Sequence, residues 1–214
     1  MNRLKLVASL IKEDSLIDIG TDHGYLVKEL LTMKKINKAI CCDINQEPLN
    51  NAKSNIKNDS VLFILSDGLL GIEPNIINQY SAISICGMGG NLISQIIDQS
   101  IENYNDKVLY LQPNNNEKML REYLISNNFN IINNVLVEEN NIIYEVFHVI
   151  KDEVVFNDKE LYFGKHILFN KDTLFYKKYN QKVEYLESLL LNINKDNIRY
   201  KQIKEEIDFI KEEL

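Results

Sequence analysis

The chain has 214 residues, of which 45% are hydrophobic and 26% are charged, and its formal net charge at pH 7 is −7. This length accommodates one full α/β core and a modest additional element, and the composition is ordinary for a globular protein. No apolar stretch reaches the roughly 18 residues that a membrane-spanning helix needs, and no cleavable signal pattern opens the chain. We therefore expect a cytoplasmic protein that does not bind membranes.

Short apolar runs alternate with helical stretches over about the first 150 residues. Strands that alternate with helices favour a doubly wound α/β sheet. In chain order, the pattern predicts a helix over Arg3–Lys12, a strand over Leu16–Gly20, a helix over Tyr25–Met33, a strand over Lys38–Asp43, a helix over Gln46–Lys57, strands over Val61–Leu65 and Ser81–Cys86, a helix over Gly90–Ser100, a strand over Val108–Gln112, a helix over Asn116–Ser126, and strands over Asn130–Glu138 and Ile142–Lys151.

The order of strand types indicates the fold class. The first five predicted strands are short and continuously apolar, as buried parallel strands tend to be. The last two are separated only by Asn140-Asn141, a turn signal that predicts an antiparallel hairpin. A mostly parallel sheet with a C-terminal antiparallel hairpin is typical of class I (Rossmann-like) methyltransferases, whereas an NAD-binding Rossmann domain usually ends differently.

The C-terminal part of the chain has a different periodicity. From Tyr176 to Ile193, and again from Tyr200 to Leu214, apolar residues recur at alternating spacings of three and four. Two such heptad helices, joined by the short polar segment 192–197, predict an α-helical coiled-coil hairpin in which each helix covers the apolar seam of the other. We therefore divide the chain into a domain of residues 1–155 and a helical hairpin domain of residues 156–214.

Charge is distributed unevenly along the chain. Residues 1–150 contain 12 Lys/Arg and 18 Asp/Glu, whereas residues 159–182 contain six lysines, one Glu and one Asp, interleaved with aromatic residues. A basic, aromatic-rich stretch is a candidate surface for nucleic-acid phosphates. The alternative interpretation is a solvated helix face whose aromatic residues belong to the core.

The three cysteines, Cys41, Cys42 and Cys86, all lie inside apolar runs. An odd number, with two adjacent in sequence, predicts reduced and buried thiols rather than a disulfide framework. The sequence contains no Cys-x-x-Cys pair, and His148 and His166 have no partners at the spacing of metal ligands. We therefore expect no metal site.

The turn after the first predicted strand is the most informative segment, because Asp18-Ile-Gly20-Thr-Asp22-His23-Gly24 combines glycines with carboxylates. Asp22 stands where a phosphate-binding loop would have its second glycine. A carboxylate there disfavours a diphosphate and favours a cofactor with ammonium and sulfonium groups. The turn therefore predicts S-adenosylmethionine as the cofactor, bound by Asp18, Gly20, Asp22 and His23. His23 has two interpretations, a catalytic base or a hydrogen-bonded structural imidazole.

The ends of the next two strands extend this site, because ligands of open α/β sheets bind beyond the carboxyl ends of the strands. Asp43 follows Gly20 by 23 residues, close to the spacing at which an acidic residue binds a ribose diol. Asp67-Gly68 follows the third strand, where a carboxylate would accept a hydrogen bond from an adenine amine. We assign Asp43, the adjacent Ile44, Asp67 and Gly68 to the cofactor. As structural alternatives, Asp43 caps a helix and Asp-Gly forms a turn.

The fourth and fifth strands also end in groups suited to a ligand. Gly87–Gly90 reads Gly-Met-Gly-Gly and opens a helix, so the backbone is expected to pass close to a ligand, and we assign Gly87 and Met88 to the cofactor. The alternative is a tight strand-to-helix turn. Residues 112–114, Gln-Pro-Asn, supply the nearest polar side chains in that layer, because the end of the fourth strand carries no acidic or Asn side chain.

Together these residues resemble the bacterial tRNA (adenine-N1)-methyltransferases that modify position 22 of tRNA. The helical hairpin is similar to the C-terminal coiled coil of that family. This chain has Thr21, Gly24 and Val27 where the family usually has Ser, Ala and Pro, and the carboxylates of the turn are intact. The matching segments run in order through the catalytic part, and they are Arg3-Leu4, Val7-Ala8, Asp18–Leu26, Asp67–Leu69, Gly87–Gly90, Leu111–Asn114, Leu120-Arg121 and Tyr144-Glu145.

The resemblance implies methyl transfer from S-adenosylmethionine to N1 of an adenine in tRNA. Neutral adenine already has a lone pair at N1, so no base is needed to create the nucleophile, and the product is cationic. The enzyme must then position the base and accept hydrogen bonds from its amine. We hypothesise that Asp22, Gln112 and Asn114 set this environment and that Tyr144 stacks on the adenine.

The resemblance also implies tRNA as the partner, and we expect the enzyme to be a monomer. We assign tRNA docking to Arg3 and to four lysines of the basic stretch, Lys165, Lys177, Lys178 and Lys182. Three alternatives stay open at this point. They are methylation of another RNA base, an NAD-binding enzyme, which Asp22 disfavours, and a non-catalytic RNA-interaction protein, which five polar or glycine-rich strand ends disfavour.

Overall fold

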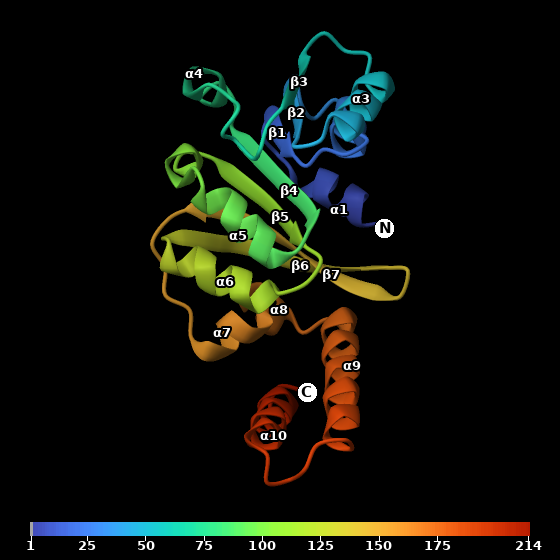
Figure 1. Cartoon of the computed structure of the whole chain (residues 1–214), viewed down its shortest axis with the longest axis vertical. Helices are drawn as coiled ribbons and strands as arrows, with labels where there is room; N and C mark the ends of the chain where they lie inside the picture. The colour runs from blue at the N-terminus through green and yellow to red at the C-terminus, as the bar shows by residue number, and fades with distance from the viewer. Residues whose placement is uncertain (1) are drawn as a thin grey trace. The chain divides into compact units, whose positions relative to one another are not determined.

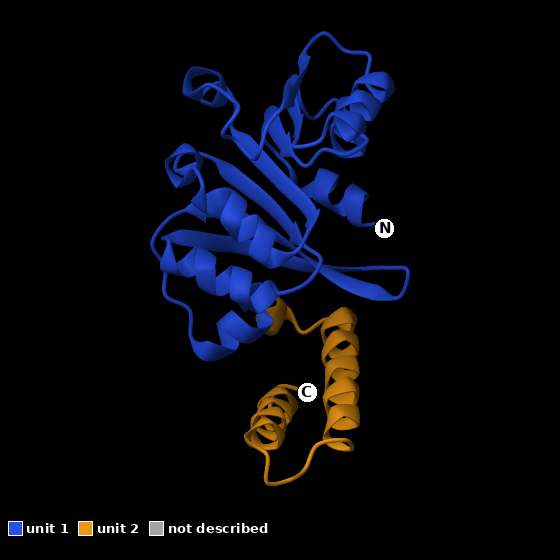
Figure 2. Cartoon of the chain, in the orientation of Figure 1, with its two compact units in different colours: residues 1–166 blue, residues 167–214 orange. Residues whose placement is uncertain are grey.

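The computed structural model describes residues 2–214. The chain divides into two compact units, the first ending at His166 and the second running from Ile167 to Leu214 (Figure 2). The predicted division between residues 155 and 156 lies earlier than this one. The difference arises because helix α7 (Asp158–Phe163) is fastened to the first unit by a buried arginine, as described below.

The first unit is built on a seven-stranded sheet (Figure 1). Its order is β3-β2-β1-β4-β5-β7-β6, in which β1 to β5 pair in parallel and β7 runs antiparallel to both β5 and β6. The predicted mostly parallel sheet with a terminal antiparallel hairpin is confirmed. Strand order reverses between β1 and β4, where ligands bind in such sheets. The strands are β1 (Ser15–Ile19), β2 (Lys38–Asp43), β3 (Val61–Leu65), β4 (Ala82–Met88), β5 (Val108–Pro113), β6 (Phe129–Glu139) and β7 (Ile142–Lys151).

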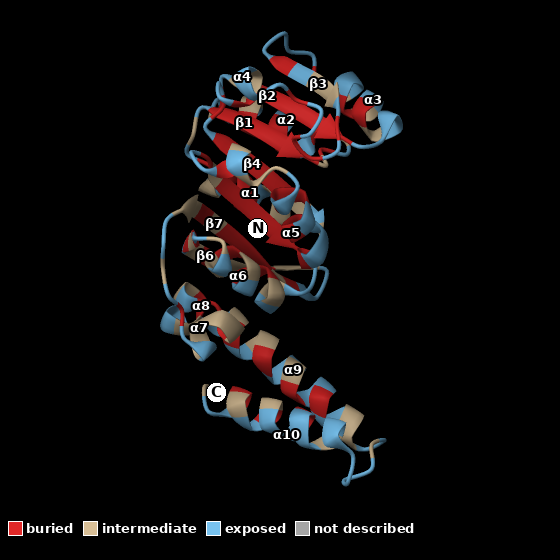
Figure 3. Ribbon diagram, turned by 60° about the vertical axis from the view of Figure 1, so that its left-hand side comes forward, coloured by how far each residue is buried: buried red, intermediate tan, exposed pale blue. Residues whose placement is uncertain are grey.

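Helices cover both faces of the sheet and enclose two apolar cores. Strand side chains alternate between faces, so β1 contributes Leu16 to one core and Ile17 and Ile19 to the other. The burial of the central strands is visible in Figure 3. The helices on the Leu16 face are α1 (Arg3–Leu10), α2 (Tyr25–Thr32) and α3 (Gln46–Asn55), and those on the opposite face are α4 (Pro74–Ile77), α5 (Gly90–Asp98) and α6 (Glu117–Ser126).

Every element predicted within residues 3–151 is present, with ends that differ by at most two residues. Helix α3, for example, ends at Asn55 instead of Lys57 because Ile56 adopts an extended conformation. Short helical elements escaped prediction because one or two turns are too few to show a periodic pattern. They are α4, the 3-10 helix η1 (Ile101–Tyr104), α7 and α8 (Lys165–Asn170).

The second unit contains a helical hairpin of α9 (Thr173–Leu190) and α10 (Ile198–Lys211), which pack against each other (Figure 1). Ion pairs join the two helices, including Lys182 to Glu206 at 3.5 Å and Lys211 to Glu187 at 2.7 Å. Each helix therefore supplies the partner that the apolar seam of the other requires. The buried seam residues are Phe175, Tyr179, Val183 and Leu186 of α9 and Ile203, Ile207 and Ile210 of α10.

A buried ion pair fastens α7 to the first unit. Arg121 of α6 donates from Nη1 to both carboxylate oxygens of Glu145, at 2.7 and 2.8 Å, and both side chains are almost completely buried. The same guanidinium donates to the carbonyl oxygens of Leu161 and Tyr162 in α7. Asn134 of β6 donates to Glu145 at 2.7 Å. One arginine thus joins α6, the end of α7 and, through Glu145, the β6–β7 hairpin.

Replacing Arg121 should be strongly destabilising, because Glu145 would remain buried without its cation. We expect Arg121→Met to lower the free energy of unfolding by about 3 to 5 kcal/mol, measured by urea denaturation followed by circular dichroism. The matched control is Lys118→Met on the same helix, which breaks an exposed pair with Glu122 at 3.5 Å and should lower it by less than about 1 kcal/mol. Equal losses in the two variants would contradict this account of the buried pair.

Candidate active site

The turn between β1 and α2 is held in shape by the neighbouring strand β2. The N–H groups of Gly20 and Thr21 both donate to the carbonyl oxygen of Cys42, at 2.9 and 3.0 Å. Gly20, Asp22 and Gly24 all have positive φ angles, of 69°, 51° and 70°. Glycine adopts this conformation without steric cost, and aspartate is one of the few other residues that visits it. The turn is therefore tight and still presents a carboxylate.

Two glycines of this turn allow close packing. A Cβ atom at Gly20 would collide with the terminal methyl of Met88, so that side chain packs directly on the turn. A Cβ atom at Gly24 would lie 2.7 Å from Ile56 and 3.1 Å from Ala52. Gly24 therefore lets the start of α2 lie against α3. Met88 was assigned to the cofactor from the sequence, and in the structure its side chain packs against Gly20 of the turn.

Asp18 lies beneath the turn. Its carboxylate is buried, and its two oxygens accept hydrogen bonds from Thr21 Oγ1 at 2.7 Å and from Ser84 Oγ at 2.6 Å. Burial raises the pKa of this carboxyl to about 6; the two hydroxyl donors act in the opposite direction, and the charge of Asp43 adds to the increase. Asp18 thus ties the turn to β4.

Asp22 and His23 stand at the tip of the turn. The Asp22 side chain is 69% exposed, and its Oδ1 lies 3.7 Å from His23 Nε2. The backbone N–H of Asp22 donates to Asp43 Oδ2 at 3.3 Å, while Asp43 Oδ1 accepts from the N–H of Asn45 at 2.9 Å. The acidic residues predicted at the ends of β1 and β2 are therefore in contact through the Asp22 backbone. The Asp43 carboxylate is held in place, and the Asp22 carboxylate is open to a ligand.

The ends of β2 and β3 adjoin this pair. Parallel pairing sets Asp43 opposite Leu65, so that Ile44 and Asp67 follow on neighbouring strands. Ile44 is 61% exposed and Asp67 is also exposed. Gly68 has a φ of 56°, and its carbonyl oxygen accepts from Ser66 Oγ at 2.8 Å. An apolar side chain and a carboxylate are thus available to a ligand beside Asp43.

The three glycines of residues 87–90, which run from the end of β4 to the start of α5, have two different roles. Gly87 has a φ of 78°, and a Cβ atom there would meet nothing within 4 Å. Cβ atoms at Gly89 and Gly90 would instead lie 3.0 Å from Asn115 and 2.7 Å from Asn116. The last two glycines therefore let the β4–α5 loop pack on the β5–α6 loop. Of these three glycines, only Gly87 has open space where a side chain would lie. There is therefore room for a ligand to approach the backbone at Gly87 and not at Gly89 or Gly90.

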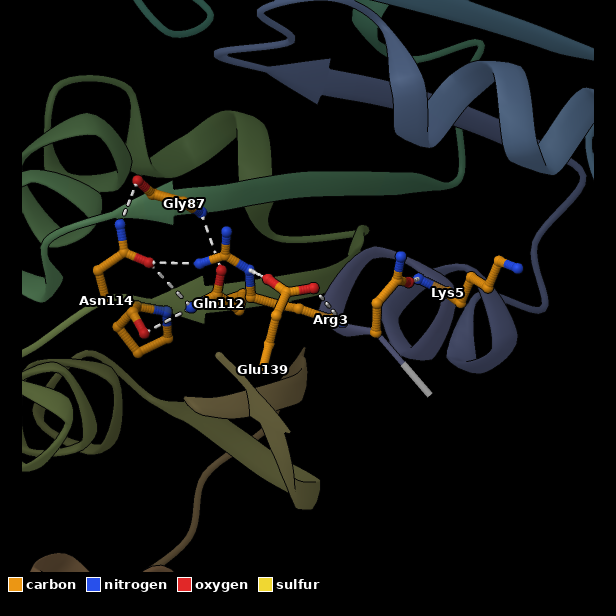
Figure 4. A network of polar contacts seen from close by, with 8 residues as sticks. Arg3, Lys5, Gly87, Gln112, Asn114 and Glu139 are labelled. Atoms are coloured by element: carbon orange, nitrogen blue, oxygen red, sulfur yellow. Dashed lines mark hydrogen bonds and ion pairs between the residues drawn. The ribbon is translucent and has the colours of Figure 1, made fainter. Parts of the chain in front are cut away.

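Gln112 and Asn114 fix the peptide groups of Gly87 (Figure 4). Gln112 Oε1 accepts from the N–H of Gly87 at 3.1 Å, and Asn114 Nδ2 donates to the carbonyl oxygen of Gly87 at 2.6 Å. Gln112 Nε2 donates to the carbonyl oxygen of Pro113 at 2.6 Å and to Asn114 Oδ1 at 3.3 Å. Both predicted catalytic amides thus bind backbone at the end of β4, and Gln112 is fully buried.

Arg3 joins this network from α1 (Figure 4). Its Nη1 donates to Asn114 Oδ1 at 2.8 Å, its Nε lies 3.6 Å from Glu139, and its guanidinium carbon lies 4.4 Å from the ring centroid of Tyr144. The sequence assigned Arg3 to tRNA docking, and the structure turns its side chain towards Asn114 and the β6–β7 hairpin. One face of the Tyr144 ring, predicted to stack on the adenine, therefore lies under this guanidinium.

A cleft of about 190 Å³ opens between the β1–α2 turn, α1 and the ends of β4 and β5. Predicted residues that line it include Asp22, His23, Gly87 and Gln112. Tyr25, which follows the recognised turn directly and is 53% exposed, was not predicted as a site residue. The apolar wall from α1 and α2 was not predicted either, because no local pattern shows which turn of a helix faces a cleft. That wall comprises Leu4, Val7 and Leu26.

The four lysines assigned to tRNA are not among the residues that line this cleft. Lys165 begins α8 in the first unit, with its Nζ 5.5 Å from the ring centroid of Phe156. Lys177, Lys178 and Lys182 lie on α9 in the second unit, where Lys182 pairs with Glu206. The basic stretch therefore spans two short helices and the first half of α9.

Cys41 and Cys42 are buried on β2, as predicted, whereas Cys86 on β4 is half-buried and not fully buried; desolvation raises the pKa of its thiol. Within residues 2–214, no three His, Cys, Asp or Glu side chains are grouped closely enough to hold a metal ion. Over the same residues, no helix is both long and apolar enough to cross a membrane.

Comparison with known proteins identifies the family. A family model described as tRNA (adenine(22)-N(1))-methyltransferase matches residues 16–212. The chain belongs to this family. A tRNA (adenine(22)-N(1))-methyltransferase of Bacillus subtilis is 33% identical over 150 residues, which are 67% of this chain and 62% of that protein. The reaction is therefore methyl transfer to N1 of adenine 22 in tRNA, which confirms the predicted enzyme class and substrate.

Solved structures of similar proteins cover both units. A Streptococcus pneumoniae protein in complex with S-adenosyl-L-methionine is 30% identical, covers 99% of this chain and 98% of its own, and has a TM-score of 0.91. TrmK of M. capricolum in complex with S-adenosyl-homocysteine is also 30% identical, covers 99% of this chain and 96% of its own, and has a TM-score of 0.90. The family resemblance thus extends through the helical hairpin.

The raised pKa of Asp18 predicts a pH-dependent cost to stability. Its folded-state pKa of about 6 exceeds the usual unfolded value of about 3.9, so the folded protein binds this proton more tightly. The free energy of unfolding therefore falls as pH rises from about 4 through about 6, because the buried carboxyl then has to lose its proton. Asp18→Asn removes this titrating group. The difference between the free energies of unfolding of the variant and of wild type should therefore change by roughly 2 to 3 kcal/mol in favour of the variant between about pH 4 and pH 6.

The measurement is urea denaturation of both proteins at several pH values on either side of 6. The matched control is Asp59→Asn, which changes an exposed carboxylate and should leave the pH profile of the wild type unaltered. A stability difference between Asp18→Asn and wild type that stays constant with pH would show that Asp18 does not titrate in this way.

Proposed function

We propose that this methyltransferase holds S-adenosylmethionine along the carboxyl ends of β1, β2 and β3 and receives the target adenine in the cleft beside Gly87. The observation that carries the proposal is the exposed Asp22 carboxylate, which stands at the tip of the glycine turn where strand order reverses. A negative charge at this point suits a cationic cofactor and opposes a diphosphate. The NAD-binding alternative is disfavoured for the same reason.

The adenosine half of the cofactor fits the ends of β2 and β3. Asp43 is held by two backbone N–H groups, so its carboxylate is already oriented for the two hydroxyls of a ribose. Ile44 offers an exposed apolar side chain to one face of an adenine ring. Asp67 offers an acceptor for the exocyclic amine of that ring. We assign these three residues and Gly68 to this half.

The methionine half fits the β1–α2 turn. Gly20 brings the backbone close to the ligand, and Asp22 and His23 stand beside it with their side chains exposed. Asp18 contributes negative charge from below, and its hydrogen bonds to Thr21 and Ser84 make it a positioning residue for the turn. The open face of Gly87 gives the reacting atoms room on the side of β4.

When bound, S-adenosylmethionine supplies an electrophilic methyl group on a sulfonium. The lone pair of adenine N1 forms the new carbon–nitrogen bond while the carbon–sulfur bond breaks with its electrons left on sulfur, so the positive charge moves onto the base. No proton has to leave N1, and His23 is not required as a base. We propose that the Asp22 carboxylate stabilises the developing charge and accepts from the N6 amine.

Gln112 and Asn114 act in this scheme by holding the end of β4. Their amides bind the N–H and the carbonyl oxygen of Gly87, which restrains the peptide groups that border the open face. Fixed backbone at this point aligns base and cofactor for an in-line transfer. The two side chains are therefore proposed as positioning residues.

Docking of tRNA is proposed for the helical part of the chain. N1 lies on the Watson–Crick edge, so adenine 22 must be unpaired or flipped out of its helix before it can react. The first unit is acidic, and the lysines of residues 159–182 provide positive charge for phosphates. We propose that residues 156–214 form the docking domain, that the enzyme acts as a monomer because α9 and α10 cover each other's seams, and that it works in the cytoplasm.

Replacing Asp22 tests the assignment of the chemistry. Asn tolerates the same positive φ angle, so Asp22→Asn should fold normally and lower the turnover number by about 100-fold or more. The assay is methylation of an unmodified tRNA transcript, with N1-methyladenine mapped by arrest of reverse transcription. A transcript with guanine at position 22 serves as the control and should not be methylated. Turnover of Asp22→Asn within a few-fold of wild type would remove Asp22 from the reaction.

Replacing two lysines of α9 tests the docking surface. We expect Lys177→Gln/Lys178→Gln to weaken tRNA binding and to reduce the slope of log K against log salt by about 2, because two phosphate contacts are lost. Filter binding at several salt concentrations measures both quantities. Lys201→Gln/Lys204→Gln on α10 is the matched control, with the same charge change in the same unit. An equal loss in both variants would contradict a specific role for α9.

A further inference from the structure

We propose that Tyr25 is the aromatic ring on which the target adenine stacks. This inference rests on the proposed function and deepens it, because it names the residue that receives the flipped base. A base outside its helix loses its stacking neighbours, and proteins that hold unpaired bases commonly replace them with aromatic side chains. A stacking ring also fixes the plane of the base, and therefore the direction of the N1 lone pair.

Tyr144 is poorly placed for this role. The guanidinium of Arg3 lies over its ring, with 4.4 Å between the guanidinium carbon and the ring centroid. Arg3 is itself held by Asn114 and Glu139. A base could replace Arg3 on that face only after these contacts broke. A base stacked on the guanidinium instead would acquire a positive charge beside an existing one.

Tyr25 is well placed. Among the described residues that line the cleft, it carries the one phenol or phenyl ring, and it is 53% exposed. Its ring centroid lies 5.3 Å from that of His23, at an interplanar angle of 32°. Within residues 2–214, its hydroxyl has no hydrogen-bond partner. A half-exposed ring without polar partners adds little to the core, and it faces the space that the proposed function gives to the base.

The backbone of Tyr25 is held firmly. It is the first residue of α2, and Gly24 before it donates to the carbonyl oxygen of Thr21 at 2.8 Å and accepts from the N–H of Lys28 at 2.9 Å. The same turn carries Asp22. The backbone positions of Tyr25 and Asp22 are thus fixed relative to each other. Such an arrangement lets one side chain contact the face of a base while the other contacts its edge.

The charge change of the reaction favours an aromatic ring at this point. The face of a tyrosine ring is electronegative, and it attracts a cation more strongly than a neutral group. Adenine enters neutral and leaves cationic. Tyr25 therefore stabilises the transition state more than the bound substrate, which is the condition for a contribution to the rate.

The test compares Tyr25→Leu, which removes the ring, with Tyr25→Phe, which keeps it. We expect Tyr25→Leu to lower kcat/KM for tRNA by about 5- to 100-fold, and Tyr25→Phe to remain within about 3-fold of wild type. Calorimetry should give the same affinity for S-adenosylhomocysteine in all three proteins. Met33→Ala, an exposed apolar residue just beyond the other end of α2, is the control for general effects on that helix.

A tRNA with 2-aminopurine at position 22 provides a readout that does not depend on turnover. Stacked in free tRNA, this base emits weakly. Its fluorescence should stay low on binding wild type and Tyr25→Phe, where it stacks again on the ring. It should rise on binding Tyr25→Leu, where it is flipped out without a ring to stack on. Equal emission with all three proteins, or full activity of Tyr25→Leu, would overturn the proposal. So would weaker binding of S-adenosylhomocysteine by Tyr25→Leu, because the ring would then belong to the cofactor site. Failure of the proposed function itself would appear separately, as an Asp22→Asn enzyme whose turnover stays within a few-fold of wild type.

Discussion

Two hydroxyl groups from different parts of the chain donate to the buried carboxylate of Asp18, and the rest of the site is arranged around this contact. Thr21 belongs to the turn that presents Asp22, and Ser84 belongs to β4, which continues to Gly87. The carboxylate therefore links the group proposed to hold the cofactor to the backbone proposed to border the base. Burying a charge is unfavourable, as the raised pKa of Asp18 records. This unfavourable burial occurs where the cofactor and the target adenine are proposed to meet.

The enzyme has to attract two ligands of opposite charge. Its cofactor and the methylated base are cationic, whereas tRNA is a polyanion. We propose that the chain meets these needs with separate segments, a carboxylate-rich turn after β1 for the cofactor and a lysine-rich stretch over residues 159–182 for tRNA. Lysines close to Asp22 would weaken the proposed stabilisation of the base, and carboxylates among the docking lysines would repel phosphate. The net charge of −7 therefore reflects the catalytic part and says little about affinity for nucleic acid.

Features set by neighbouring residues could be predicted from the sequence, and features set by distant contacts could not. Strand periodicity, the Asn-Asn turn and the heptads predicted all seven strands and the longer helices, because each pattern is local, whereas α4, η1, α7 and α8 are too short to show one. Acidic strand ends identified Asp22 and Asp43 as neighbours, since parallel strands end at one edge. Arg3 was assigned to docking because only its charge is visible in the sequence, whereas its contact with Asn114 joins residues 111 positions apart. Tyr25 was passed over because exposure within a cleft leaves no periodic signal.

The buried pair of Arg121 and Glu145 also has an evolutionary meaning. Loss of either member alone leaves an uncompensated charge in the interior, so the two are expected to be inherited together or replaced in quick succession. Neither side chain is among the residues that line the cleft. Selection on this pair therefore acts through the stability of the fold and not through the methylation reaction. A descendant that had lost Asp22 and its methylating activity would still keep the pair, which makes it a marker of shared ancestry even among homologues that no longer modify tRNA.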